Sequence, residues 1–311
     1  MSPVSGLGGS TVASPTATSE EFDMSTDVRL TFKTRPQHTE WGPMADFWLE
    51  AEGIEALEGG WLYDHFYPIP PHTGPGMDST GTCFEGWTAL SYLAGRTQRL
   101  RLGLMVTGNP YRHPAVLANM AATFDVFSGG RLELGLGAGW NQEESDAYGI
   151  ELLPIGKRMD QLEEACEVID RLLTQTCANF EGHYYQLRDA RCEPKPVQAP
   201  RPPLVIGGQG EKRTLRIAAR YADEWNFPGG SPEQFAHKVE VLHGHCHDLG
   251  RDPSEIATST HVFVVGDPAQ TAEQAAAFAE AGASHLVLYF LDCSDPSWLG
   301  KTSEAVVSAL G

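Results

Sequence analysis

The sequence has 311 residues, 41% of them hydrophobic, and a formal net charge of −19. This composition supports a large core, yet no run of 18 apolar residues is present, so we expect no membrane span. The negative charge disfavours contact with phosphate backbones, so we also expect no nucleic-acid partner.

The first residues are rich in Ser, Thr, Gly and Pro, and we expect residues 1–24 to form a disordered tail. A secretory signal needs a basic start and an apolar stretch, and this segment has neither. Met24 precedes the first predicted strand and is a candidate translation start. The six cysteines show no Cys-x-x-Cys spacing, which is typical of a reduced cytoplasmic protein. We therefore expect a cytoplasmic protein with one folded domain over residues 25–311.

Short apolar runs alternate with helical periodicity along this domain. Strands are predicted at residues 28–32, 60–64, 99–106, 131–137, 203–208, 223–227, 259–266 and 284–290. Helices are predicted at residues 43–56, 84–97, 115–127, 157–173, 211–222, 232–248 and 269–282, with a last helix ending near residue 310. A small extra hairpin is predicted at residues 180–187.

Eight strand–helix units in alternation predict a parallel sheet, and their number predicts a closed (β/α)₈ barrel, a TIM barrel, with insertions. An open doubly wound sheet is the alternative, but no Gly-x-Gly-x-x-Gly motif opens the first unit. Because active residues of such barrels lie at the carboxyl ends of the strands, the search for a site reduces to eight short segments.

Asp64 and His65 end the second strand, where they either cap and pack the loop or perform chemistry. At a barrel strand end we favour chemistry, because histidine titrates near neutrality and can exchange a proton with a substrate. The fourth strand ends with Gly137, Gly139 and Trp140. The glycines allow close approach of the backbone to a ligand, and the indole offers a flat apolar surface.

The fifth strand ends in a glycine-rich turn, "GGQGEKR", that leads into a helix. Backbone amides at a helix start suit a phosphate, although a tight turn without a ligand is the alternative. "HGHCH" at residues 243–247 has the spacing of a metal cluster but lies late in a helix on the outer ring. We therefore expect no metal site.

At these strand ends the sequence resembles the luciferase-like monooxygenase superfamily, and within it the branch that uses coenzyme F420, a 5-deazaflavin. The matching text is "DHFYPI", "GNPYRHPAVLANMAATFDVFSGGRLELGLGAGW", "FEGHYYQL" and "PKPVQAPRPPLVIGG". The resemblance covers residues 28–256 in order and implies a bacterial luciferase-like barrel. Taken together, these motifs are highly specific for the superfamily, less specific for the cofactor, and give almost no information about the substrate.

The resemblance also implies roles for individual residues. Asp64 would contact the ring side of the cofactor, and His65 would act as the base toward the substrate. The bulge ending the third strand would back the ring with a non-prolyl cis peptide bond between Met105 and Val106. The remaining implied cofactor contacts are Thr107 in the bulge, Ala138 and Gly139 at the ring and ribityl chain, and Gly207, Gly208, Gln209 and Gly210 at the phosphate.

The chain departs from the F420-dependent dehydrogenases at two positions. Trp140 stands where they carry a glutamate, and Ile69 where they carry a tryptophan. Both departures argue against a sugar phosphate or a simple alcohol as substrate. Lys33 and His38 follow the first strand and are expected at the same mouth, so Lys33, His38 and Trp140 are the candidate substrate residues.

These features predict an F420-dependent oxidoreductase that transfers a hydride between the deazaflavin and a small organic molecule, with His65 managing the proton. An FMN-dependent monooxygenase fed by a separate flavin reductase is the main alternative. A non-catalytic flavin-binding protein is the alternative of another class. The resemblance further implies a homodimer.

Overall fold

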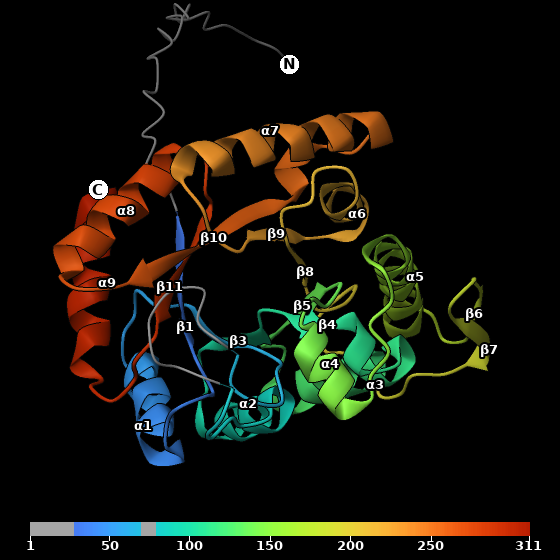
Figure 1. The fold of residues 1–311 in the computed structure, drawn as a ribbon, viewed down its shortest axis with the longest axis horizontal. Coiled ribbons are helices and arrows are strands. Elements are labelled where there is room, and N and C mark those ends of the chain that lie inside the picture. The colour runs from blue at the N-terminus through green and yellow to red at the C-terminus, as the bar shows by residue number, and fades with distance from the viewer. Residues whose placement is uncertain (1–27, 70–78) are drawn as a thin grey trace, which may run out of the picture.

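The computed structural model describes residues 28–69 and 79–311. The tail expected over residues 1–24, including Met24, lies outside these ranges. Within them, eight parallel strands form a closed barrel that is ringed by helices, which confirms the predicted fold class (Figure 1). The strands are β1 (Arg29–Thr34), β2 (Gly59–Leu62), β3 (Arg101–Leu104), β5 (Leu132–Gly137), β8 (Leu204–Gly207), β9 (Glu224–Phe227), β10 (Ala257–Val264) and β11 (His285–Phe290).

The first and last strands pair in parallel, and β3 pairs with β5, so the sheet has no open edge between them. A two-residue strand, β4 (Thr107–Gly108), continues the pairing along β5 after a bulge. Since all these pairings are parallel, the carboxyl ends of the strands converge at one mouth of the barrel.

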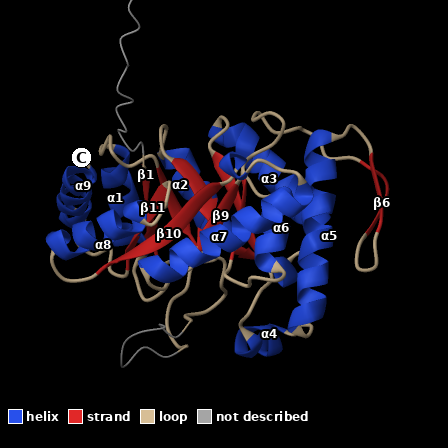
Figure 2. Cartoon of the chain, turned by 90° about the horizontal axis from the view of Figure 1, so that it is seen from above, coloured by secondary structure: helices blue, strands red, loops and turns tan. Residues whose placement is uncertain are grey.

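The helices surround the strands, as the view from above shows (Figure 2). They are α1 (Trp41–Glu52), α2 (Gly86–Arg96), α3 (Pro114–Ser128), α5 (Ile155–Thr174), α6 (Thr214–Tyr221), α7 (Pro232–Leu249), α8 (Pro268–Glu280) and α9 (Ser297–Leu310), with 3-10 turns at Asn109–Tyr111 and Pro253–Glu255. In the described part of the chain, no helix is long and apolar enough to cross a membrane.

The predicted hairpin is present as β6 (Ala178–Glu181) and β7 (Gln186–Ala190), which project beyond α5 at one edge of the molecule. A short helix, α4 (Gln142–Tyr148), was not predicted. Asn141 caps its first turn by accepting a hydrogen bond from the Glu144 amide, and Gly149 ends it with φ of 67°. The helix follows β5 and so places its side chains at the barrel mouth.

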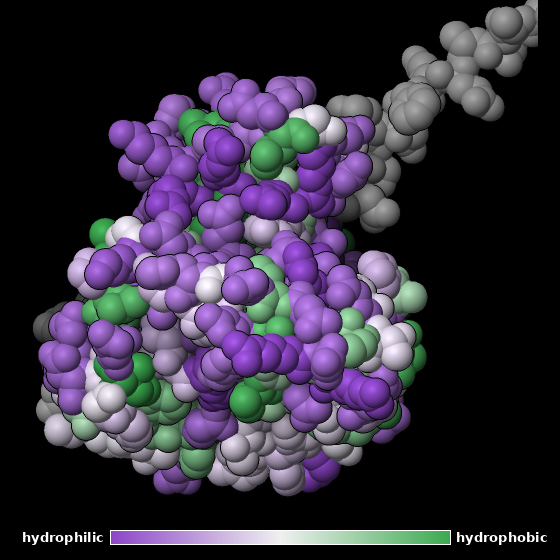
Figure 3. All heavy atoms as spheres, turned by 90° about the vertical axis from the view of Figure 1, so that its right-hand side faces the viewer, coloured by the Kyte–Doolittle hydropathy of each residue, from purple (hydrophilic) through white to green (hydrophobic). Residues whose placement is uncertain are grey.

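The hydrophobic side chains form two groups. The larger cluster fills the space between the strands and the helices and includes Phe32, Trp48 and Trp225. A smaller cluster inside the barrel joins Trp61, Met105, Val205 and Val287. The outer face that Figure 3 shows is mostly hydrophilic with scattered apolar residues, as expected for an acidic chain with its apolar side chains inside.

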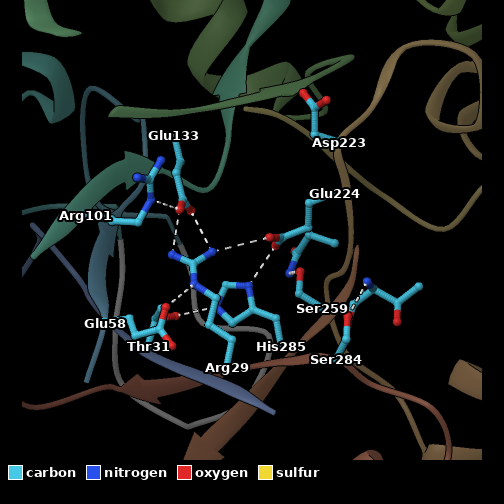
Figure 4. A network of polar contacts seen from close by, with 12 residues as sticks. Arg29, Thr31, Glu58, Arg101, Glu133, Asp223, Glu224, Ser259, Ser284 and His285 are labelled. Atoms are coloured by element: carbon cyan, nitrogen blue, oxygen red, sulfur yellow. Dashed lines mark hydrogen bonds and ion pairs between the residues drawn. The ribbon is translucent and has the colours of Figure 1, made fainter. Parts of the chain in front are cut away.

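A polar network closes the amino end of the barrel (Figure 4). Arg29 donates to both oxygens of the buried Glu133 carboxylate, over 3.1 and 2.5 Å. His285 contacts Glu224 over 3.0 Å and Thr31 over 2.7 Å. These buried charges are paired, so their burial is compensated by partners. The network lies at the end of the strands where barrels carry stability rather than chemistry.

Candidate active site

A cavity of about 360 Å³ opens at the carboxyl ends of the strands. Each of the eight barrel strands, or the loop that follows it in sequence, contributes to the lining. In strand order, these residues include Lys33, His65, Met105, Gly137, Gly207, Asn226, His261 and Tyr289. The volume lies at the lower end of the roughly 300–1,000 Å³ of small-molecule sites. Such a cavity takes a flat ring or a small substrate and leaves longer groups outside.

One wall of the cavity carries a hydrogen-bonded group of three side chains. His65 is buried, and its Nδ1 lies 2.7 Å from Oε2 of the fully buried Glu144. The Tyr111 hydroxyl donates to the same oxygen over 2.6 Å. The backbone N–H of Phe66 donates to Oε1 over 2.6 Å. Oε2 of Glu144 therefore accepts from Tyr111 and contacts His65, while Oε1 accepts from the backbone directly after His65.

This arrangement determines the charge and the tautomer. Burial opposes ionisation of Glu144, but the hydrogen bonds and charge of His65 and the donors Tyr111 and Phe66 outweigh it and lower the pKa of this carboxyl. Burial and the hydrogen bond to Glu144 raise the pKa of Tyr111, which stays protonated. An ionised carboxylate only accepts, so Nδ1 of His65 carries the proton that it donates, and Nε2 on the other side of the ring remains for a substrate.

Asp64 lines the same cavity but is already held by a cation. Its carboxylate accepts from both terminal nitrogens of Arg112, one of them over 3.1 Å, and Arg112 also donates to Glu85 over 2.8 Å. Burial raises the pKa of Asp64, and the Arg112 guanidinium opposes that shift. Glu85 in turn caps the first turn of α2. The Asp64 side chain thus ties the end of β2 to the loop after β4 and to α2.

The bulge after β3 has the conformation that the resemblance implies, with a cis peptide bond between Met105 and Val106. The Val106 side chain lies between two strand-end glycines. A Cβ added at Gly137 or Gly207 would come within 2.7 or 2.8 Å of its methyl groups. Glycine at both positions is therefore required for Val106 to reach the cavity wall. Thr107 is buried behind the bulge and accepts a hydrogen bond from Trp87 over 3.1 Å.

The residues expected after β5 lie at the cavity. The lining includes Ala138, Gly139 and Trp140. Gly139 has φ of 77°, and a Cβ added there would come within 2.9 Å of the Pro110 ring. Trp140 is 51% exposed, and its ring meets the His65 ring edge-on at 5.6 Å. The position that departs from the dehydrogenases is thus in contact with the candidate catalytic histidine.

The glycine-rich turn after β8 only partly faces the cavity. Gly207 and Gly208 line it, whereas Gln209 and Gly210 are exposed. Gly208 has φ of 127°, a conformation that favours glycine. Its N–H donates to Asn226 over 3.1 Å, so this amide is already engaged within the barrel.

The two candidate residues of the first strand separate in the structure. Lys33 is buried on the cavity floor, where its Nζ donates to the Met105 carbonyl over 2.9 Å. His38 is exposed and is not among the residues that line the cavity, because the chain turns there with φ of 50°. Gln37 lines the cavity instead, and its side-chain amide donates to the Ile69 carbonyl and accepts from the Ile69 N–H. The expected shared position at the mouth is therefore wrong for His38.

Sequence reasoning missed Glu144, Tyr111 and Arg112. For Glu144 a local indication exists, since Asn141 followed three residues later by a glutamate is the pattern of a capped helix start. In this chain the Glu144 side chain turns away from the cap to His65, 79 residues earlier. Nothing in the local pattern indicates that second partner.

The described residues contain no group of three or more His, Cys, Asp or Glu side chains that could hold a metal ion. Of the "HGHCH" residues, His245 contacts the Glu211 carbonyl over 2.7 Å and Cys246 is buried, both on α7 outside the barrel. The cluster is therefore not part of the candidate site.

Solved structures show the same fold over most of the chain. An F420-dependent secondary alcohol dehydrogenase in complex with an F420-acetone adduct superposes with a TM-score of 0.79 at 18% identity, covering 91% of this chain and 99% of that one. The EDTA monooxygenase of Chelativorans sp. BNC1 superposes with a TM-score of 0.74 at 12% identity, covering 90% and 94%. At these identities the likeness concerns the fold alone.

Among curated proteins, a phthiodiolone/phenolphthiodiolone dimycocerosates ketoreductase of Mycobacterium sp. (strain JLS) is 35% identical over 187 residues, which is 58% of this chain and 48% of that protein. The protein of that name in Mycobacterium kansasii is 30% identical over 226 residues, 67% of this chain and 59% of its own. The chain thus spans about half to three fifths of the length of these relatives. The family model described as luciferase-like monooxygenase matches residues 54–290. That match covers well over half of the chain, which therefore belongs to the luciferase-like monooxygenase family.

Proposed function

We propose that this protein is an F420-dependent oxidoreductase that transfers a hydride between the deazaflavin and a small organic substrate, with His65 managing the proton. The observation that carries the proposal is the buried Glu144–His65 pair at the cavity wall, over 2.7 Å. A relative named as a ketoreductase and a solved neighbour named as an F420-dependent alcohol dehydrogenase support this class of reaction.

The lining of the cavity supports a flat ring as the ligand. Val106 gives the cavity an apolar wall, and Gly137 and Gly207 leave no side chain between that wall and the strand ends. Of the residues that the resemblance implies for the cofactor, those that line the cavity and would hold it are Asp64, Met105, Val106, Ala138, Gly139, Gly207 and Gly208. Thr107, Gln209 and Gly210 are not among the lining residues, so they would act from behind the bulge or from the exposed turn. When bound, a deazaflavin supplies two-electron hydride chemistry, and the protein supplies position and proton transfer. Because the Gly208 amide is engaged, the phosphate would rely on the other amides of the turn.

In the proposed reaction, the side chains around the cavity have separate roles. Glu144 holds the Nδ1 proton of His65, so Nε2 can give a proton to a substrate oxygen in a reduction or take one in an oxidation. Tyr111 fixes the same carboxylate. Asp64, held by Arg112, positions the backbone on which His65 sits. Trp140 lies against His65 and narrows the substrate side of the cavity.

Side-by-side titration of the purified protein with F420 and FMN tests the cofactor. We expect tighter binding of F420. Equal or tighter binding of FMN, with oxygen consumption once a flavin reductase is added, would establish the second candidate, an FMN-dependent monooxygenase. The fold shared with the EDTA monooxygenase is the observation that favours this alternative. A flavin reductase would be a partner only in that case.

Two substitutions separate the roles at the end of β2. His65→Ala is expected to leave F420 affinity within a few-fold while the hydride-transfer rate falls by about 10²–10⁴-fold, the usual contribution of a positioned acid or base. Asp64→Ala is expected to weaken cofactor binding first. A His65→Ala enzyme with the original rate and pH profile would remove His65 from the mechanism. Gel filtration would test the homodimer that the resemblance implies.

A further inference from the structure

A buried lysine lies on the cavity floor without an acidic partner. Lys33 is 5% exposed, and within residues 28–69 and 79–311 no ion pair includes it. Its Nζ donates to the Met105 carbonyl over 2.9 Å and lies 3.5 Å from Nε2 of His261. Buried ammonium groups are normally paired with a carboxylate or a bound anion. Among the described residues, the hydrogen-bond contacts of Lys33 are instead a carbonyl and an imidazole.

The imidazole beside Lys33 is neutral. Burial and the nearby Lys33 charge lower the pKa of His261 well below its ordinary value. Nδ1 of His261 lies 3.3 Å from the Pro228 carbonyl, and Nε2 lies 3.1 Å from Sδ of Met105, so each ring nitrogen has an acceptor beside it. His261 accepts from at most one Lys33 donor and the Met105 carbonyl from another, so at least one of the three Lys33 donors remains for the cavity.

A second donor close to Lys33 also lacks a partner. Tyr63 lines the cavity, is 4% exposed, and its buried hydroxyl has no hydrogen-bond partner among the described residues. Burial raises the pKa of Tyr63, so the hydroxyl keeps its proton. Lys33 Nζ lies 5.7 Å from the centre of the Tyr63 ring and 4.7 Å from that of Tyr289. Orphaned buried donors that line one cavity indicate that a ligand supplies the acceptor.

Among the described residues, no carboxylate forms an ion pair with Lys33, and Asp64, which lines the same cavity, is held by Arg112. The titratable and polar groups around Lys33 come from each neighbouring strand: Arg35 after β1, Tyr63 after β2, the Met105 carbonyl after β3, Asn226 on β9, His261 on β10 and Tyr289 on β11. Burial lowers the pKa of Lys33 to about 7, because nothing nearby favours its charged form. An anion bound here would reverse that effect and draw a proton onto the lysine.

We propose that Lys33 and Tyr63 form an anion subsite on the cavity floor, which binds one negatively charged oxygen of a ligand. A carboxylate or enolate of the substrate has this chemistry, and so has the anionic carbonyl system of a reduced deazaflavin. The proposal deepens the proposed function, on which the second of these sources rests. It predicts that the ligand is recognised as an anion and that a proton is taken up when it binds.

Benzoate is a suitable probe, because it joins a carboxylate to a flat apolar ring. Calorimetry on the full chain without cofactor, in MOPS and Tris buffers, measures proton uptake from the difference in binding enthalpy. Above pH 7 we expect benzoate affinity to fall as Lys33 loses its proton. Lys33→Met is expected to weaken binding at pH 6.5 by roughly 10- to 100-fold, the loss of a hydrogen bond to a charged group, and to abolish proton uptake. Tyr63→Phe should weaken binding less and keep the uptake.

Lys195→Met is the control, because Lys195 likewise donates to backbone carbonyls, those of Leu172 over 2.8 Å and Cys192 over 2.9 Å, but lies outside the cavity. It should bind benzoate as the unaltered protein does. Urea unfolding shows whether Lys33→Met remains folded, and Lys33→Gln, which keeps a donor without the charge, serves as a second variant. If folded Lys33→Met binds benzoate with unchanged affinity and pH dependence, the substrate is refuted as the source of the anionic oxygen.

A second arm compares oxidised and reduced F420 and distinguishes the two sources. If the cofactor supplies the anion, the reduced form binds more tightly, and Lys33→Met removes that preference. If only benzoate binding depends on Lys33, the substrate supplies the anion. Failure of F420 to bind would refute the proposed function, while the benzoate arm would still decide the subsite. Binding that is independent of Lys33 in both arms refutes the subsite.

Discussion

The Glu144 carboxylate makes a sharp test of the site, because it is the acceptor for three donors. Glu144→Gln keeps the size of the side chain but turns one acceptor oxygen into an NH₂ donor. If the amide oxygen faces the Phe66 N–H, the NH₂ group faces His65 and Tyr111. Nδ1 of His65 must then accept a hydrogen bond from the NH₂ group, so the histidine proton must move from Nδ1 to Nε2. The substitution should therefore reverse the tautomer of the histidine.

The cost in stability follows from the contacts. The carboxylate accepts hydrogen bonds of 2.6, 2.6 and 2.7 Å in a buried position, and hydrogen bonds to charged groups contribute about 1.5–3 kcal/mol each. Since a glutamine preserves part of them, we expect the free energy of unfolding to fall by roughly 2–4 kcal/mol. The pKa of Glu144 is lowered in the folded protein, so its ionised form stabilises the fold above its ordinary value of 4.5. That contribution is lost as the pH falls below 4.5 through the folded pKa.

Urea unfolding between pH 3 and pH 7 measures the stability difference, and ¹⁵N NMR of the imidazole nitrogens reports which one carries the proton. Glu143→Gln is the matched control, since Glu143 is the adjacent residue of α4 but is exposed. We expect the control to change neither observable. A Glu144→Gln protein with unchanged stability at pH 7 and Nδ1 still protonated would refute the assigned role of Glu144.

Three further predictions test other parts of the structure. Gly135→Ala would place a Cβ 1.9 Å from the Leu104 carbonyl oxygen, so we expect unfolding free energy to fall by about 3 kcal/mol or more. Gly244 lies in α7 with open space where a Cβ would be placed, so Gly244→Ala should instead raise the free energy of unfolding by up to about 1 kcal/mol. Equal changes in unfolding free energy for the two variants in urea titrations would contradict the packing described for Gly135. Because Lys33 has a folded pKa of about 7, below its ordinary 10.5, the unfolded chain binds more protons between these values. The stability of the unaltered protein relative to Lys33→Met should therefore rise from pH 7 to pH 10 in urea titrations, and a flat difference would contradict the low pKa. Gly208→Leu should weaken F420 far more than its dephosphorylated deazaflavin core in fluorescence titrations, whereas equal losses would indicate damage to the fold.

The barrel could be predicted from the sequence because its causes are local. A strand buried on both faces requires a continuous apolar run, and each outer helix requires an apolar stripe, so strand and helix alternate visibly along the chain. The run at residues 131–137 corresponds to β5 (Leu132–Gly137), and the helix predicted over 157–173 to α5 (Ile155–Thr174). The short helix α4 was missed because its seven residues bury few side chains and show little periodicity.

The position of the site was also predictable, because parallel strands bring all their carboxyl ends to one mouth. His65, Val106 and Gly207 were expected there from strand boundaries and the family resemblance, and all three line the cavity. His38 was misplaced because one turn residue with positive φ redirects the chain, and sequence alone does not indicate where that turn falls.

The partners of the site residues were decided only by the tertiary structure. Whether Asp64 faces a ligand or Arg112, and whether His65 meets Glu144, depends on segments that are 48 and 79 residues away in sequence. Lys33 shows the same limit, since its strand position was evident but the absence of an acid around it in the described residues was not. Charge, tautomer and hydrogen bonding depend on distances of a few ångströms between separate segments, and the local sequence pattern contains no record of those distances.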